Sequence, residues 1–550
     1  MASIGYFNAF NWAIDATEVG SLVFGNTTVA QQNQNTLTLQ SVLNSGGDLR
    51  ITVPGTYLFN TTNGPLTIPS NTSLYLGTGV ELKTADGSPS ALLTNAAARS
   101  TGTVVPGANI SYAAWTEGGG YIAVLTNLAQ ATAANFPVGS WISVVIGGEG
   151  ALGAAGTAWA SRGYRGVQRV VKQVLAGAAS SISYTIDSIY PGSAPSTNPA
   201  TIYRADENIR LWGQGIINGN SAAASTAYVT GDPRGVVVWW RHLTNIVVED
   251  IRFRRGVTWT MGSNYVRNYT VTHIGGDTRL PVGQLPTADL VHLSGNHQQV
   301  LVDTIDIGCE DNPIGMTIDC TIGTLYNFPY QNPGDMTDII VRNVCTATPG
   351  GMIAMYGPAA YWYRNIFIDN PSGASGSAAL QLSNYAPTNQ NKLSIDSLTF
   401  ANARTYANVM VECLTANVEI GTLLIENVLT PREDIRAIQF GPTCSGTIRS
   451  LILRNVNTFP ANNTNFTRTV PLVTFGGMNI TALAIANSEV IVLAANVKAF
   501  EADGTGNIGK VGIRDCSATG TGTAAVWGDT GAGTAAVPVY NNATYNGVAL

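Results

Sequence analysis

The chain has 550 residues, of which 11% are charged, and it carries a net charge of −6 with an isoelectric point near 5.3. A disordered chain would be richer in charge and poorer in apolar residues, so this composition excludes a largely disordered protein. An acidic chain without a basic run also argues against a nucleic-acid partner, because binding to phosphates needs a basic surface. The 60 glycines suit many short strands joined by tight turns.

Six cysteines are scattered along the chain without a CxxC pair, so we expect small buried side chains and no zinc site. No metal ion and no cofactor is expected. No run of about 18 apolar residues is present to span a membrane. The first residues lack a basic and an apolar region, so no signal peptide is expected, and a protein acting outside the cell would leave by another route.

Residues 1–47 are expected to form an N-terminal segment that ends in a short helix. Asn35 or Thr36 is the expected start of this helix, and Gly46-Gly47 its end. A helix at this position would cap the open end of a stack of strands.

After this helix the apolar period changes to two, and residues 48–99 are expected to form the first coils of that stack. The rhythm is broken over 100–205, which is expected to be a small inserted β module. Residues 206–520 are expected to resume the stack as its main part. The Gly-, Thr- and Ala-rich end, 521–550, is expected either to cap it or to contact sister chains.

A degenerate repeat from about residue 206 carries the fold prediction. Its template is apolar-x-apolar-x-x-apolar, and successive copies after residue 339 begin 27, 27, 25, 33, 32 and 28 residues apart. This spacing is typical of one coil of a parallel β-helix. No helical pattern is available for a βαβ crossover, and the hairpins of a β-propeller are not evident. We therefore predict an all-β, right-handed, single-stranded parallel β-helix.

Three carboxylates fall about one coil apart within this repeat. Asp289 precedes Glu310 by 21 residues and Asp311 by 22. Neighbouring strands lie about 4.8 Å apart, so the three side chains are expected to crowd one face. Crowded carboxylates split into protonated and ionised forms, as glycoside hydrolysis requires of its acid and base.

The same region resembles the polygalacturonases, pectin hydrolases built on a parallel β-helix. The matching stretches, within roughly 206–370, are Thr287-Ala288-Asp289, Cys309-Glu310-Asp311, Gly213-Gln-Gly-Ile-Ile-Asn-Gly219 and the coil from Asn245 to Trp259. The resemblance implies that Glu310 is the general acid, while Asp289 and Asp311 hold and deprotonate the attacking water in an inverting displacement.

Two departures from that family bear on the substrate. The family's Gly-His-Gly is replaced by a stretch that begins at Tyr326, and its Arg-Ile-Lys falls on Ile353-Ala-Met-Tyr356. Because no basic residue stands there to grip a uronate, a neutral or differently decorated glycan is expected in place of pectin.

The N-terminal stretch resembles a second group, the bacteriophage tailspikes. It runs from Asn35 through Gly46-Gly47 into Ile51-Thr-Val-Pro-Gly-Thr-Tyr57. This resemblance implies a homotrimer carried on the virion by a phage tail or baseplate adaptor. It also implies action outside the cell on bacterial capsule or lipopolysaccharide O-antigen, without membrane insertion.

Five further residues are candidates for contact with substrate. Trp259, Tyr265 and Tyr356 could stack on sugars, and Arg364 could bind an anionic substituent. His292 could assist proton transfer. It stands at an odd spacing from Asp289, however, so strand alternation favours a buried, hydrogen-bonded histidine on the opposite face.

The leading hypothesis is an endo-acting glycoside hydrolase, a tailspike depolymerase directed at a bacterial surface polysaccharide. A polysaccharide lyase on the same fold is the first alternative, and it would need a base and a cation to stabilise the enolate. A non-catalytic adhesin that only binds the glycan is the second.

Overall fold

The computed structural model describes most of the chain. The described residues are 14–15, 22–25, 27–88, 92–146, 166–186, 199–220, 236–256, 259–279, 289–318, 334–357, 361–384, 393–414, 417–430, 434–441, 444–458, 468–521 and 525–550. Thr287, Ala288, Tyr326 and one of the six cysteines, Cys320, lie outside them. Among the described helices none has the length and hydropathy needed to cross a bilayer.

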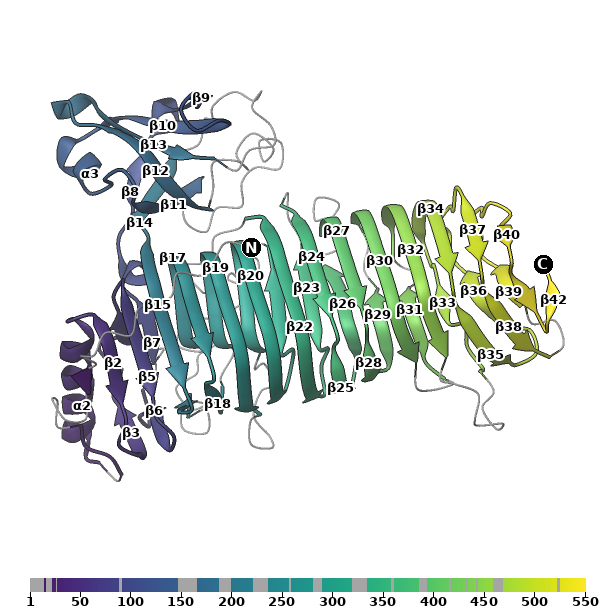
Figure 1. Ribbon diagram of the computed structural model, residues 1–550, viewed down its shortest axis with the longest axis horizontal. Helices are drawn as coiled ribbons and strands as arrows, with labels where there is room; N and C mark the ends of the chain where they lie inside the picture. Colours follow the sequence, from purple (N-terminus) through teal and green to yellow (C-terminus); the bar gives the residue numbers. More distant parts are fainter. Residues whose placement is uncertain are drawn as a thin grey trace.

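The chain folds as a right-handed parallel β-helix, as predicted, and Figure 1 shows its strands stacked along the long axis. The early coils contain β2 (Gly47–Ile51), β3 (Gly55–Phe59), β4 (Leu66–Ile68), β5 (Thr72–Leu76), β6 (Val80–Thr84) and β7 (Leu93–Asn95). The long strands of the main part are β15 (Asp206–Gly213), β17 (Val236–Glu249), β19 (Trp259–Asp277), β20 (Asp289–Gly308), β22 (Met336–Thr348), β24 (Tyr363–Asp369), β27 (Leu393–Ala401), β30 (Val418–Thr430), β32 (Gly446–Thr458) and β34 (Met478–Ala486).

Each coil also contributes a shorter strand to a second face of the stack. These strands include β21 (Ile314–Thr317), β23 (Ile353–Gly357), β26 (Ala378–Asn384), β29 (Val409–Cys413), β31 (Arg436–Phe440), β33 (Val473–Thr474) and β36 (Lys498–Ala502). Successive members pair in parallel, so equivalent positions of neighbouring coils form straight columns along the axis.

The apolar template has a direct structural meaning. Its first two apolar residues point inward from one face, and the two-residue gap holds a corner where the chain turns toward the next face. In β30 the corner residue is Asn427, with φ of 54°, and in β32 it is Asn455, with φ of 51°. Asparagine tolerates this left-handed conformation better than other residues with a Cβ, which explains its frequent place in the repeat.

The corner asparagines also bond to one another along the axis. The Nδ2 of Asn455 donates to Oδ1 of Asn427 at 2.8 Å, and Asn427 donates in turn to Asn402 at 2.9 Å. Asn402 donates to the carboxylate of Asp369 at 2.6 Å. In these coils the sequence therefore places an asparagine that both turns the chain and fixes the register of the neighbouring coil.

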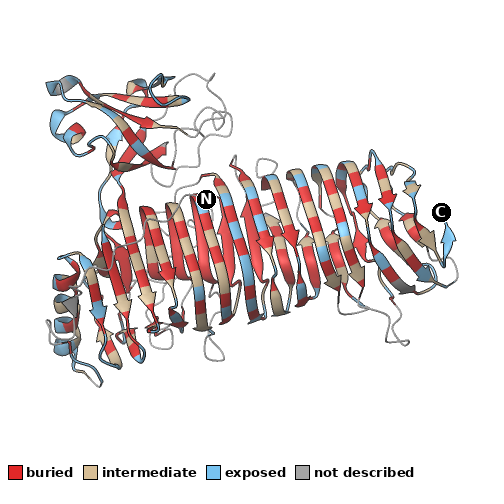
Figure 2. Cartoon of the chain, in the orientation of Figure 1, coloured by how far each residue is buried: buried red, intermediate tan, exposed pale blue. Residues whose placement is uncertain are grey.

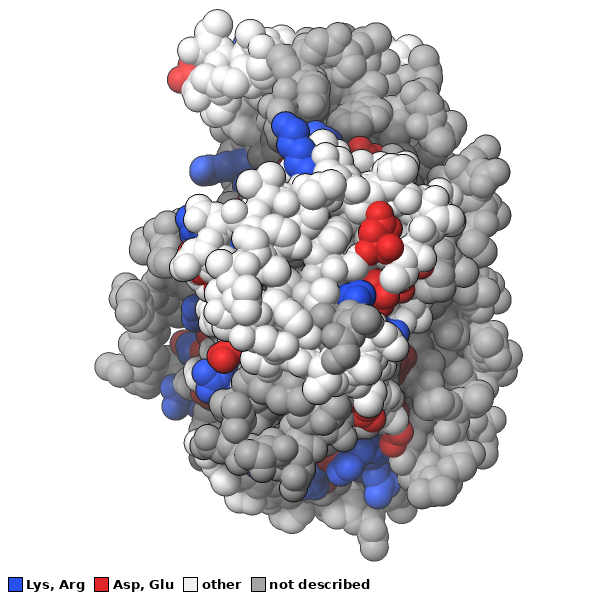
Figure 3. Space-filling view, turned by 90° about the vertical axis from the view of Figure 1, so that its right-hand side faces the viewer, with Lys and Arg blue, Asp and Glu red and all other residues white. Residues whose placement is uncertain are grey.

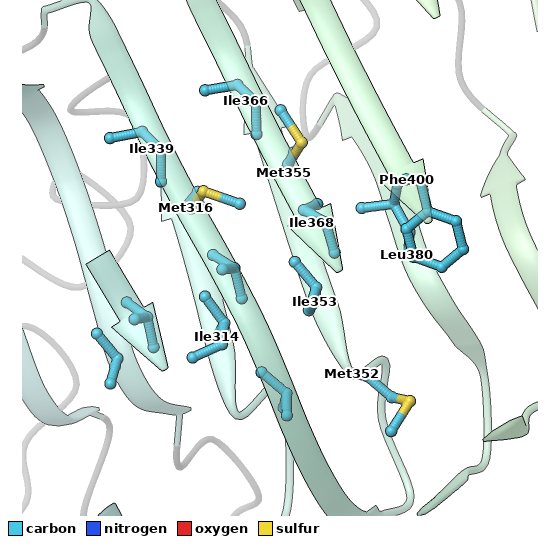
Figure 4. Close-up of a cluster of buried hydrophobic side chains, with 14 of the residues drawn as sticks. Ile314, Met316, Ile339, Met352, Ile353, Met355, Ile366, Ile368, Leu380 and Phe400 are labelled. Carbon is cyan, nitrogen blue, oxygen red and sulfur yellow. The ribbon is translucent and has the colours of Figure 1, made fainter. Parts of the chain in front are cut away.

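A single apolar core runs through the stack. Figure 2 shows buried and less buried residues alternating along the strands, as period-two patterning requires. Figure 4 shows part of this core, in which Ile314 and Met316 of β21 lie beside Ile353 and Met355 of β23. All four side chains are fully buried. The residues between them on these strands, Gly315 and Ala354, therefore belong to the outward face.

The described cysteines follow the expected pattern with one exception. Four are buried within the described chain: Cys309, Cys413, Cys444 and Cys516. Cys345 is exposed, contrary to the expectation, because it occupies an outward position of β22.

The capping helix α2 begins earlier than predicted. It spans Val29–Leu43, and its N-cap is Thr28, which exchanges capping-box hydrogen bonds with Gln31. Asn35, the predicted start, instead lies within the helix, buried, with its Nδ2 donating to the carbonyl of Val23 at 2.7 Å. The capping-box residues Thr28 and Gln31 were the sequence signal that the prediction missed.

The predicted insertion is a separate antiparallel sheet with its own small core. Its strands are β8 (Thr103–Val105), β9 (Ile110–Ala114), β10 (Tyr121–Leu128), β11 (Trp141–Ile146), β12 (Gly166–Val174), β13 (Ser180–Thr185) and β14 (Ala200–Arg204), with the short helix α3 (Gln130–Ala134). The stack continues across it, because β15 pairs with β5 on one side and with β17 on the other.

The inserted sheet rests on the β-helix through polar and aromatic contacts. The ring of His242 stacks on Tyr203 at 3.9 Å, and its Nδ1 lies 2.6 Å from Oγ of Ser143. Arg267 donates to the carbonyl of Val167 at 3.3 Å. Burial lowers the pKa of His242 well below its ordinary value, so this imidazole is neutral.

Coils continue past the boundary expected at residue 520. Strand β39 (Ala525–Asp529) pairs with β36, and β40 (Val539–Asn541) pairs with β37 (Val511–Arg514). A small sheet of β35 (Glu489–Leu493), β38 (Ser517–Gly520), β41 (Thr544–Tyr545) and β42 (Val548–Ala549) lies beside them. Figure 3 looks onto this end, where most of the described surface is uncharged.

Candidate active site

The predicted carboxylates lie where β20 and β21 run side by side. Val291 of β20 pairs with Ile314 of β21, so one coil here measures 23 residues. Extended by two residues, this register sets Asp289 opposite Asn312. The predicted separation of 21 or 22 residues between stacked positions was therefore one or two residues too small. Asp311 comes one residue before the position that stacks directly on Asp289.

Asp289 is held inside the protein. It is only 5% exposed, its Oδ2 lies 2.6 Å from Nδ1 of His292, and its Oδ1 accepts the backbone N–H of Asn312 at 3.2 Å. Burial raises the pKa of this carboxyl from 3.8 to about 7, although the hydrogen bonds from Asn312 act in the opposite direction. Asp289 therefore holds a proton over much of the range in which an ordinary aspartate is ionised.

Asp311 is coupled to Asp289 and is more accessible. Its side chain is half-buried, and its Oδ1 accepts the side-chain N–H of Asn312 at 2.9 Å. Asn312 thus bonds to both carboxyl groups. Desolvation is the largest cause that raises the pKa of Asp311 to about 7, and the nearby charge of Asp289 is the second. The pair is an arrangement in which one proton is retained near neutral pH.

Glu310 lies beside this pair and close enough to Arg279 for the two charges to interact. It is half-buried and directly precedes Asp311 in the chain. The pKa of Arg279 is raised, mainly by its hydrogen bond and charge interaction with Asp277 and to a smaller extent by the charge of Glu310. The three predicted catalytic residues therefore occupy one small region, with Asp289 innermost.

His292 is buried and hydrogen-bonded, as the sequence favoured, but it is not on the opposite face from Asp289. Asp289 is the first residue of β20, where the regular alternation begins, so its carboxyl can reach the side chain three positions later. The Nε2 of His292 lies 3.0 Å from Oγ1 of Thr317. Its ring stacks on Trp259 at 3.7 Å between centroids. Burial lowers the pKa of His292 to about 3, against the smaller effect of the charge of Asp311.

The remaining candidates divide between this region and other contacts. Trp259 is 4% exposed and covers His292, whereas Trp239, stacked on Trp259 at 6.4 Å, is the half-exposed ring of the pair. Tyr356 is 7% exposed, and its hydroxyl donates to Oε1 of Gln381 at 3.4 Å on the same outward face.

Two candidates are engaged elsewhere. Tyr265 is fully buried in the cluster between the inserted sheet and the β-helix, packed with Val145 and Val167, so it cannot meet a glycan there. Arg364 lies 3.3 Å from the carboxylate of Asp335, and its guanidinium lies 5.8 Å from the ring centre of Trp362. This guanidinium therefore serves an internal ion pair.

Sequence reasoning missed Asn312 and Thr317. Both follow the carboxylate motif closely, and the apolar pair Ile314 and Met316 between them could have marked their place on the outward side of the next strand. Over the described ranges, no three His, Cys, Asp or Glu side chains lie close enough together to hold a metal ion.

No known family model matches this chain, and no curated protein sequence matches it. Among solved structures, the tailspike of Pseudomonas phage LKA1 is 11% identical, with a TM-score of 0.44, covering 92% of this chain and 83% of the other. A tailspike of E. coli bacteriophage HK620 in complex with a pentasaccharide is 10% identical, with a TM-score of 0.41, covering 96% and 80%. A family 28 exopolygalacturonase of Yersinia enterocolitica is 10% identical, with a TM-score of 0.35, covering 98% and 79%. What the chain has in common with these proteins is the parallel β-helix fold.

Proposed function

We propose that this protein is an endo-acting glycoside hydrolase that shortens a bacterial surface polysaccharide, a capsule or an O-antigen. The observation that carries the proposal is the coupled carboxyl pair of Asp289 and Asp311, bridged by Asn312, with Glu310 beside it. Hydrolysis of a glycosidic bond needs one carboxyl group that delivers a proton and a second that activates water or attacks the sugar.

The roles follow from accessibility and protonation together. A general acid must be protonated near neutral pH and must also reach the glycosidic oxygen. The pKa of Asp311 is raised to about 7 and its side chain is half-exposed, so Asp311 fits this role. Asp289 is too deeply buried to touch a sugar, and its charge supports the raised pKa of Asp311. Glu310 is assigned the activation of water, which reverses the roles that the family resemblance implied.

The residues near this pair favour an uncharged stretch of glycan. The outward column that contains His292 continues through Gly315, Ala354 and Gln381, none of which is charged, although only Gln381 is not buried. The guanidinium of Arg279, the cation near Glu310, is hydrogen-bonded to Asp277. A uronate subsite would need a cation to meet each carboxylate. Trp239, half-exposed on the other side of His292, offers a ring on which a sugar can stack.

The proposal includes the setting that the N-terminal resemblance implied: a homotrimer on a virion, joined to a tail adaptor and acting outside the cell. Light scattering of the purified chain measures its oligomeric state directly.

The decisive experiment uses a panel of capsular polysaccharides and O-antigens, with product sizes followed by mass spectrometry. Asp311→Asn and Glu310→Gln should each lower turnover roughly 10²- to 10⁴-fold while the fold and glycan binding persist. Asp306→Asn, which removes an exposed carboxylate of β20 a few residues before Glu310, is the matched control.

Three outcomes contradict the proposal. Unchanged turnover in both variants would remove these carboxylates from the chemistry. Products with the ultraviolet absorbance of an unsaturated uronate would indicate a lyase, because hydrolysis forms no double bond. Binding without any change in polymer length would indicate an adhesin.

A further inference from the structure

The imidazole of His292 is fixed on three sides, by Asp289, Thr317 and Trp259. Its Nδ1 lies 2.6 Å from Oδ2 of Asp289, and its Nε2 lies 3.0 Å from Oγ1 of Thr317. One ring face lies on Trp259, with 12° between the planes. Every member of this group is at most 5% exposed, so solvent does not compete for these contacts.

The neighbouring coils leave room for this group by having glycine in register with His292. Gly262 is the register neighbour on β19, and Gly315 is the neighbour on β21. A Cβ at Gly315 would lie 2.5 Å from Oδ2 of Asp289 and 2.7 Å from Nδ1 of His292. Any side chain at this position would therefore push directly on the bond between the carboxyl and the imidazole.

Two proton arrangements satisfy both hydrogen bonds that join Asp289, His292 and Thr317, which together are called the proton chain here. In the first, Asp289 is ionised and accepts from Nδ1–H of His292, while the Thr317 hydroxyl donates to Nε2. In the second, which holds one more proton, the Asp289 carboxyl donates to Nδ1 and Nε2–H donates to Thr317. The imidazole is neutral in both, which agrees with the lowered pKa of His292. A proton taken up at Nε2 thus releases the Nδ1 proton to Asp289.

We propose that His292 is a positioning residue that orients the Asp289 carboxyl and supplies its proton from the Thr317 side. This proposal rests on the proposed function, because it gives Asp289 its effect on the catalytic Asp311. His292 does not touch the glycan in this arrangement. It acts through Asp289, whose charge is the second cause that raises the pKa of Asp311.

Within the described residues, few titratable groups act on the proton chain of Asp289, His292 and Thr317. Asp311 favours the charged imidazole of His292, and the pKa of His297 is lowered by burial and, less, by the charge of His292. Burial raises the pKa of the Cys309 thiol to about 12, with the charges of Asp289 and Asp311 among the smaller causes, so this thiol stays neutral.

The first test is the pH profile of glycan cleavage in His292→Leu. Without its nitrogen partner, Asp289 is expected to stay protonated, so the charge that raises the pKa of Asp311 is lost. The alkaline limb of the kcat profile should then move to lower pH by about one unit, the usual effect of a neighbouring charge. His297→Leu is the matched control, since it also removes a buried imidazole of β20 but leaves Asp289 untouched.

The second test needs no substrate, because Trp259 reports on the ring stacked against it. The contribution of Trp259 is the tryptophan fluorescence of the native protein minus that of Trp259→Phe. It should change with pH around 7, the value to which the pKa of Asp289 is raised. This change should vanish in Asp289→Asn, should shift in Thr317→Val, and should be restored in Thr317→Ser, which returns the hydroxyl.

The two tests separate this inference from the proposed function. If His292→Leu lowers cleavage equally at every pH and leaves the alkaline limb of the kcat profile at its original pH, His292 has only a structural role. This result would overturn the inference without contradicting the proposed hydrolase. A fluorescence change that persists in Asp289→Asn would overturn it as well. If no glycan is cleaved but the change depends on Asp289 and Thr317 as expected, the proton chain stands and the hydrolase fails.

Discussion

Replacement of Asp289 by asparagine is expected to stabilise the folded chain at alkaline pH, even though it removes a group of the proposed active site. The asparagine matches the protonated aspartate, because its Oδ1 can accept the N–H of Asn312 while its amide donates to Nδ1 of His292. The variant thus keeps the hydrogen bonds of the neutral state and removes the buried charge.

The magnitude follows from the raised pKa. Burial raises the pKa of Asp289 from 3.8 to about 7. These values are about 3 pH units apart, and each unit corresponds to about 1.4 kcal/mol, so the ionised carboxylate lowers the free energy of unfolding by at most about 4 kcal/mol. The folded state binds this proton more tightly than the unfolded chain. Stability from this group is therefore fully present below about pH 4, declines between about 4 and 7, and is lost above that range.

Urea unfolding of the native protein and of Asp289→Asn, at about pH 4 and about pH 8, measures this effect. The two proteins should differ little at the lower pH, and the variant should unfold at a clearly higher urea concentration at the higher pH. Asp306→Asn, which removes an exposed carboxylate, should show no such pH-dependent difference. An equal difference between Asp289→Asn and the native protein at both pH values would refute the placement of a buried, titrating proton on Asp289.

Two further predictions concern the stack itself. Asn427→Ala should lower the free energy of unfolding by roughly 1–3 kcal/mol, because alanine is strained at φ of 54° and cannot bond to Asn402. Asn427→Gly, which relieves only the strain, should recover part of that loss in the same denaturation measurement. Met316→Ala should cost about 2–5 kcal/mol through the cavity it leaves in the core, and Met316→Leu less than about 1.5 kcal/mol. Equal losses in the two variants of either pair would contradict the reasoning.

The coil spacing and the period-two pattern were sufficient to predict the parallel β-helix. The exact coil length at the site was not predictable, because it depends on how many residues each turn uses. The spacing of Asp289 from Glu310 and Asp311 suggested direct stacking, whereas the pairing of Val291 with Ile314 sets Asn312 opposite Asp289.

Alternation was a reliable guide only inside regular strands. It predicted that His292 and Asp289 lie on opposite faces of the strand. Asp289 is the first residue of that strand, however, and its carboxyl turns toward the imidazole. The burial of Tyr265 could not be predicted from the residues next to it in the sequence. It is buried by residues of the inserted sheet, more than a hundred positions away, such as Val145.

The sequence by itself determined the fold and brought the acidic residues to one region, because both depend on local periodicity and on a separation of the carboxylates close to one coil. Only the tertiary structure decided how the protons are distributed. The raised pKa values of Asp289 and Asp311 come from burial and from contacts with residues of neighbouring coils, and these depend on how the stack closes around the side chains. Desolvation is a property of the packed molecule, so no local pattern of residues could have shown which carboxyl keeps its proton.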